Sequence, residues 1–128
     1  MTEEREWEVA GVGPVGPVGP GAALAELRAM AAEGGFEAWL TNGSGRQLAV
    51  VSNTERVMVV LTEGAGDPGG HAVDPGAEGR SSGFVLTNGQ YDEYPDEDTV
   101  PIGRALRIVE HILATGRPPA DTLWSVDR

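Results

Sequence analysis

The densest group of side chains that could take part in chemistry is an acidic segment in the C-terminal half of the chain. Five of its seven residues carry a carboxylate, in the order Asp92-Glu93-Tyr94-Pro95-Asp96-Glu97-Asp98. Carboxylates at suitable spacing bind calcium or act as the acid and base of a glycosidase. In a calcium loop the oxygen ligands stand at alternating positions and the sixth residue is glycine. This segment has neither the alternation nor the glycine. Glycosidase sites are lined by aromatic residues, which make up only 5% of this chain.

Two interpretations of the acidic segment stay open. Asp96, Glu97 and Asp98 precede a predicted helix, whose dipole stabilises acids near its start by about 0.3–1 kcal/mol each. Asp92 and Glu93 lie further upstream, where that dipole is weak. Crowded like charges cost stability, so their concentration also favours a surface that binds a protein. The residues of this candidate partner-binding site are Asp92, Glu93, Tyr94, Asp96, Glu97 and Asp98.

Other chemistry has little support in the sequence. Cysteine is absent, which excludes disulfides, thiolate metal sites and a cysteine nucleophile. His71 and His111 are the only histidines, and a catalytic zinc site would need carboxylates to complete it. A serine nucleophile, Ser81 or Ser82 with His71, can be imagined, but no motif resembles a nucleophile elbow. We therefore expect no catalytic residues, no metal, no cofactor and no enzymatic activity.

The charge balance indicates what kind of partner the chain attracts. Twenty acids stand against nine bases, all arginine, and the net charge is −11. A surface this negative repels phosphate backbones, so direct nucleic-acid binding is disfavoured. It speeds encounter with a basic protein, although acidity also serves solubility alone.

Apolar periodicity predicts two helices that position the acidic segment. Residues 22–33 place Leu24, Leu27, Met30 and Ala31 on one face and end at a glycine pair. The second helix ends at Gly116, before two prolines. Its apolar stripe consists of Ile102, Ala105, Leu106, Val109, Ile112 and Leu113.

The segments between the helices predict strands. Residues 57–61 form a continuous β-branched run, typical of a central strand buried on both faces. Asn88-Gly89 between β-prone runs predicts a two-residue hairpin turn of type I′. Residues 63–82 predict a long loop, and 122–126 a last short strand. Together the elements predict an α+β fold, with a mostly antiparallel sheet of about five to six strands and two helices packed on it.

The N-terminal 21 residues differ from the rest. Trp7 and Val9 alternate with glutamates, a weak signal for an edge strand, and Gly-Pro-Val triplets at 13–21 predict an extended linker that contributes little to the core. We therefore divide the chain into residues 1–21, a strand-like segment and linker, and residues 22–128, a single domain. No apolar run is long enough to span a membrane, and the acidic start is unlike a secretion signal. These features predict a soluble, cytoplasmic protein.

The C-terminal half contains a series of short motifs in a fixed order. They are Gly83-Phe84-Val85-Leu86, Asn88-Gly89, Asp92-Glu93-Tyr94-Pro95, Val100-Pro101, Ala105-Leu106, Leu113, Thr115-Gly116, Pro118 or Pro119, and Leu123-Trp124. In order and spacing they resemble a known family, the one numbered first among the bacterial immunity protein families. The resemblance covers residues 83–124 well and 22–126 loosely. It implies a small protein that binds and neutralises a cognate polymorphic toxin, often of the nucleic-acid deaminase class.

Two alternative functions stay open at this stage. The first is an acidic mimic of nucleic acid that inhibits nucleases or DNA-binding proteins generally. The second is a small ligand-binding domain that uses residues 63–82 as a lid, which predicts a deep pocket beside that loop.

Overall fold

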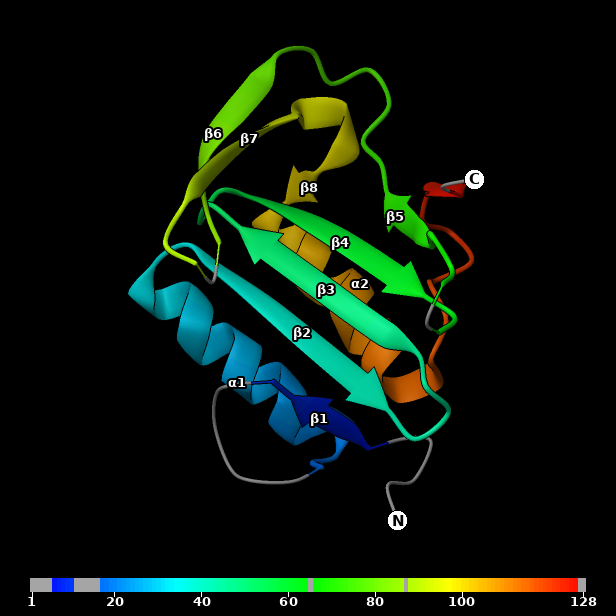
Figure 1. Ribbon diagram of the computed structural model, residues 1–128. Helices are drawn as coiled ribbons and strands as arrows, with labels where there is room; N and C mark the ends of the chain where they lie inside the picture. Colours follow the sequence, from blue (N-terminus) through cyan, green and yellow to red (C-terminus); the bar gives the residue numbers. More distant parts are fainter. Residues whose placement is uncertain (1–5, 11–16, 65, 87, 127–128) are drawn as a thin grey trace.

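A computed structural model describes residues 6–10, 17–64, 66–86 and 88–126 of the chain (Figure 1). The fold is α+β, as predicted: a mostly antiparallel sheet with two helices packed on one face. The main sheet has seven strands in the order β1-β2-β3-β4-β5-β9, with β8 paired to β4, and β6 and β7 form a separate two-stranded hairpin. The strands are β1 (Trp7–Val9), β2 (Phe36–Asn42), β3 (Gln47–Ser52), β4 (Arg56–Thr62), β5 (Gly70–Ala72), β6 (Arg80–Val85), β7 (Tyr91–Pro95), β8 (Val100–Pro101) and β9 (Trp124–Val126).

Strand β4 is an interior strand, which confirms the prediction for residues 57–61. It pairs with β3 on one side and with β5 and β8 on the other. Its burial alternates, however: Val57, Val59 and Leu61 are buried, whereas Met58 and Val60 are only half-buried. Burial on both faces was therefore a wrong expectation, because the helices cover only one face of the sheet (Figure 1).

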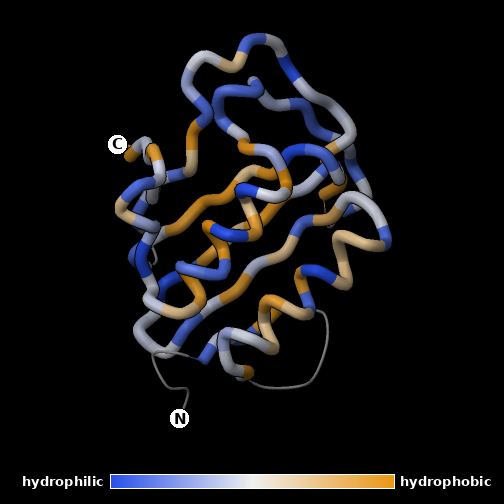
Figure 2. The backbone as a smooth tube through the Cα atoms, turned by 180° about the vertical axis from the view of Figure 1, so that it is seen from behind, coloured by the Kyte–Doolittle hydropathy of each residue, from blue (hydrophilic) through white to orange (hydrophobic). Residues whose placement is uncertain are grey.

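The two helices are α1 (Pro20–Glu33) and α2 (Ile102–Thr115). Helix α1 begins two residues before the predicted start, since Pro20 has the φ that a first turn needs. Helix α2 ends as predicted at Gly116, whose φ of 76° is the left-handed conformation that glycine allows. Seen from the helix side, apolar residues are concentrated in the central strands and on the helices, and the hairpin end is mostly polar (Figure 2).

The N-terminal segment belongs to the core. Strand β1 pairs with β2 at the sheet edge, as the alternation predicted. Trp7 is fully buried, and its indole Nε1 donates a hydrogen bond to the main-chain oxygen of Leu113, 2.9 Å away. The main chains of Trp7 and Val18 exchange two hydrogen bonds, of 2.8 and 2.9 Å. The expectation that residues 13–21 form only an extended linker is therefore wrong for Val18 and Pro20. Residues 11–16 lie outside the described part of the chain.

The β6–β7 hairpin confirms the predicted antiparallel pairing, but its turn is longer than two residues. The N–H of Gly89 donates to the oxygen of Leu86, and the N–H of Leu86 donates to the oxygen of Gln90, both at 2.9 Å. Gly89 has a φ of 84°, whereas Asn88 is not among the positive-φ residues, so the turn is not type I′. The predicted loop at 63–82 contains β5 and the start of β6. No helix in the described ranges is long and apolar enough to cross a membrane.

Replacing Trp7 tests whether the N-terminal strand stabilises the domain. We expect Trp7→Ala to lower the free energy of unfolding by about 3–5 kcal/mol, because a fully buried aromatic ring leaves a cavity. Trp7→Phe keeps most of the apolar area but leaves the Leu113 oxygen unpaired, which costs about 1–3 kcal/mol. Urea unfolding measures both. A loss below about 1 kcal/mol for Trp7→Ala would contradict an integral β1.

Candidate functional site

The acidic segment runs along β7 into a short 3₁₀ turn, η1 (Asp96–Asp98), at the end of the molecule where the hairpin lies (Figure 1). Helix α2 begins only at Ile102, after β8, and its first turn contains no acidic residue. The helix-dipole interpretation of Asp96, Glu97 and Asp98 is therefore wrong, because a helix dipole acts only within the first turn.

One arginine organises the region around η1. The guanidinium of Arg56 donates from Nε to the hydroxyl of Thr99, and from Nη2 to a carboxylate oxygen of Asp74, both at 2.7 Å. Nη2 also lies 3.0 Å from the main-chain oxygens of Asp96 and Thr99. Arg56 stands at the start of β4, so these bonds tie η1 and the Asp74 turn to a central strand of the sheet.

Asp74 receives a second arginine. Arg104 of α2 donates to its other oxygen at 3.3 Å. The hydrogen bond from Arg56 is the main cause that lowers the pKa of Asp74 below its ordinary value, and Arg104 adds to it. Asp74 therefore stays charged, and it joins α2 to the same network.

Two of the predicted site residues have local partners. Asp96 accepts a 2.5 Å hydrogen bond from the hydroxyl of Ser81 and lies 3.9 Å from Nε of Arg56. Glu93 pairs with Arg80 of the neighbouring strand at 2.6 Å, with both side chains about half exposed. A pair this exposed contributes at most about 1 kcal/mol. Asp96 is thus a structural residue, whereas Glu93 remains accessible.

Tyr94 and Asp92 form a second unit on β7. The Tyr94 ring packs edge-on against the fully buried Phe84, with 4.8 Å between the centroids. Burial of the phenol, followed by its hydrogen bond to Asp92, raises the pKa of Tyr94 to about 12, and the charge of Glu37 adds to this. The same hydrogen bond lowers the pKa of Asp92, with help from the N–H of Glu93. Asp92 itself is exposed.

The last two predicted residues lie on η1. Asp98 meets Nε2 of His71 at 3.0 Å. The side chain of Glu97 is exposed and has no hydrogen bond or ion pair within the described residues, while its main-chain oxygen accepts from Asp74 at 2.8 Å. The six predicted residues thus follow one another along β7 and η1, and we call this stretch the acidic rim: Asp92, Glu93, Tyr94, Asp96, Glu97 and Asp98.

The imagined serine nucleophile has a different arrangement. Ser81 donates its hydroxyl to Asp96, and His71 faces Asp98, so each of them holds a carboxylate. His111 lies exposed on α2. In the part of the chain that the structure describes, no three histidine, aspartate or glutamate side chains gather as a metal site.

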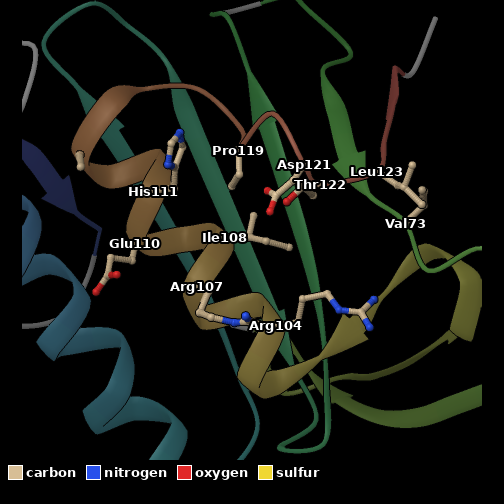
Figure 3. Close-up of a pocket in the computed structure, with 11 residues that line it drawn as sticks. Val73, Arg104, Arg107, Ile108, Glu110, His111, Pro119, Asp121, Thr122 and Leu123 are labelled. Carbon is tan, nitrogen blue, oxygen red and sulfur yellow. The ribbon is translucent and has the colours of Figure 1, made fainter.

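A surface groove lies between α2 and the segment before β9 (Figure 3). It has a volume of about 630 Å³, and Ile108 forms its floor between His111 and Asp121. Of residues 63–82, only Val73 lines it. A smaller groove, of about 260 Å³, is lined in part by Glu63, Asp67 and the glycine pair at 69–70. Residues from the segment at 63–82 thus border this smaller groove. The lid hypothesis predicted a deep pocket beside that segment.

Three residues that the structure singles out were not predicted from the sequence: Arg56, Asp74 and Trp39. Nothing local distinguishes Arg56 or Asp74, because their partners lie 18 to 43 positions away. Trp39 is 43% exposed on the sheet face that carries no helix. Its signal was available: Ala38 and Leu40 are buried, so period-two alternation places Trp39 on the opposite face.

Neither a protein-family model nor a curated protein sequence matches this chain. The assignment of the site therefore depends on its geometry and on the charge of its residues.

Removing the Arg56 guanidinium tests its organising role. We expect Arg56→Gln to lower the free energy of unfolding by about 2–4 kcal/mol, because it leaves Asp74 and two main-chain oxygens without their charged donor. Arg117→Gln is the matched control, since that side chain is exposed, and it should change stability by less than about 0.5 kcal/mol. Equal effects in the two variants would contradict the role of Arg56.

Alkaline titration tests the Tyr94–Asp92 unit. The pKa of Tyr94 is raised, so its stabilising contribution is complete below pH 10 and is lost as the pH rises through about 12. The tyrosinate absorbance of the wild type minus that of Tyr94→Phe should show a step near pH 12, with circular dichroism confirming the fold at each point. A midpoint near pH 10 would show that the phenol is neither buried nor bonded to Asp92.

Proposed function

We propose that this chain is an immunity protein that binds a cognate toxin in the cytoplasm and occludes the toxin's basic substrate site. The toxin we propose is a nucleic-acid deaminase-type domain. The observation that carries the proposal is the acidic rim, where five carboxylates stand on a backbone held by Arg56 and by the Phe84–Tyr94 contact, in a chain of net charge −11.

The rigidity of the rim is what supports binding rather than mere solubility. Arg56 fixes η1, the Phe84–Tyr94 contact fixes β7, and Asp92 is oriented by the Tyr94 hydroxyl. Charges that are held in place before binding lose little conformational freedom on association. A fixed acidic surface also steers a basic partner and raises its association rate.

The resemblance of residues 83–124 to the first immunity protein family points the same way. The matching motifs Gly83-Phe84-Val85-Leu86 and Asp92-Glu93-Tyr94-Pro95 contain the Phe84–Tyr94 contact, so they include the residues that build the hairpin. A toxin acting on DNA or RNA presents a basic groove to its substrate, and an inhibitor that fills this groove needs no chemistry of its own. The expected interface has the standard size, on the order of 1,600 Å².

Reversing one rim charge tests the proposal. Glu97 is the best position because its exposed carboxylate supports no contact in the described structure, so Glu97→Lys changes charge without changing the scaffold. The partner is the protein encoded by the gene adjacent to that of this chain. We expect Glu97→Lys to lower the association rate roughly two- to tenfold at low salt and to weaken its salt dependence.

The matched control is Glu110→Lys, an equal charge change at an exposed site on α2. If both variants slow association equally, net charge rather than the rim guides the partner, which favours the general nucleic-acid mimic. If the wild-type chain neither binds the adjacent gene product nor protects cells that express it, the immunity proposal is wrong.

A further inference from the structure

The sheet has a face without a helix, and an exposed tryptophan stands on it. Both helices lie behind the sheet in Figure 1, and the strands β2, β3 and β4 face the viewer. Trp39 of β2 points to this face, because its neighbours Ala38 and Leu40 are buried against the helices. At 43% exposure it presents a large part of its indole to solvent.

Strand register places Trp39 in a continuous row. Trp39 pairs with Ala49, Ala49 with Val60, and Val60 with His71, so one residue from each of four strands stands side by side on this face. Ala49 is 4% exposed and Val60 is half-buried, which makes the floor of the row apolar. We call these four residues the Trp39 row: Trp39, Ala49, Val60 and His71.

Carboxylates stand at both ends of the row. At the far end, His71 contacts Asp98 of the acidic rim at 3.0 Å. At the near end, Glu37 precedes Trp39 by two residues and shares its face, which sets the two Cα atoms roughly 6.6 Å apart. The charge of Glu37 also contributes to the raised pKa of Tyr94. The row is thus an apolar strip with acidic ends, continuous with the acidic rim.

We propose that the Trp39 row is the surface on which an arginine-bearing loop of a protein partner docks, with one guanidinium stacked on Trp39 and bonded to Glu37. This deepens the proposed function, because the partner is the toxin and the loop belongs to its basic substrate groove. An exposed aromatic ring flanked by a carboxylate satisfies both properties of a guanidinium, its flat face and its fork of N–H donors. Val60, which is half-buried in the row, offers apolar surface to the methylene stem of the arginine.

Arginine fits this surface better than lysine does. The guanidinium is planar and weakly hydrated, so it stacks on an indole while its edge donates to a carboxylate. An ammonium is a compact, strongly hydrated charge that cannot do both. The surface therefore predicts that an arginine ligand binds more tightly than a lysine ligand of equal charge. Simple attraction to a negative protein predicts no such preference.

The first test uses peptides of alternating glycine and arginine, or glycine and lysine, with the intact chain. The three tryptophan indole N–H signals in a ¹⁵N correlation spectrum report on Trp7, Trp39 and Trp124 separately. We expect the Trp39 signal to shift with the arginine peptide and less with the lysine peptide. Trp39→Leu and Glu37→Gln should each raise the Kd of the arginine peptide about threefold to thirtyfold.

Tyr91→Ala is the matched control, because Tyr91 is also an exposed aromatic residue, 74% accessible, but it stands on β7 outside the row. It should leave the peptide Kd unchanged. Equal affinity for the two peptides, or equal loss in Tyr91→Ala and Trp39→Leu, would overturn the proposal. Because Trp39 is exposed, Trp39→Leu should keep the fold, which the dispersion of the remaining indole and amide signals verifies.

The second test separates this surface from the immunity function. If wild type and Trp39→Leu bind the adjacent gene product with equal Kd, the Trp39 row is refuted as the docking surface while the immunity function stands. If the peptides show arginine preference at Trp39 but the wild type does not bind that gene product, the docking surface stands and the immunity function fails. A weaker complex in Trp39→Leu with an unchanged complex in Tyr91→Ala supports both.

Discussion

The hydrogen bonds of one guanidinium hold together the end of this protein that carries the acidic rim. Arg56 reaches from the start of β4 to Asp74, Thr99 and the main chain of Asp96, and these partners come from segments that are otherwise short and irregular. The main-chain oxygen of Asp96 also accepts from the N–H and the hydroxyl of Thr99, both at 3.1 Å. Arg56 adds a charged donor to that oxygen and to the main-chain oxygen of Thr99, so an acidic turn can remain ordered beside a central strand.

Other arginines also pair with carboxylates on the acidic surface. Arg80 neutralises Glu93 across the hairpin, and Arg104 adds a second donor to Asp74. Arginine suits these positions because its donors form a rigid fork that serves several acceptors together. The chain nevertheless has many more acids than bases, and an exposed carboxylate such as that of Glu97 has no cation beside it in the described structure. The positions of the arginines therefore determine which acids of the rim keep an uncompensated charge.

The sequence was sufficient for features that local rules decide. Helix α2 and its end at Gly116 follow from a 3.6-residue stripe and a glycine cap, and the interior position of β4 follows from its apolar run. It was insufficient where distant segments decide burial. Trp7 enters the core because Leu113, 106 positions later, accepts its indole hydrogen bond. The helix-dipole interpretation of the acids at 96–98 failed because β8 separates them from α2, and a two-residue strand leaves almost no pattern in a sequence.

Alternation along β2 separates the side chains of the core from those of the proposed docking surface. Ala38 and Leu40 pack against the helices, while Glu37 and Trp39 face the side without a helix. A substitution on that side changes the proposed docking surface without creating a cavity under the helices, because the two sets of side chains never share a face. The contact of His71 with Asp98 then links the open face to η1. Strand, hairpin and 3₁₀ turn thus contribute to one surface, whose shape depends on Arg56 and whose chemistry can vary independently of the fold.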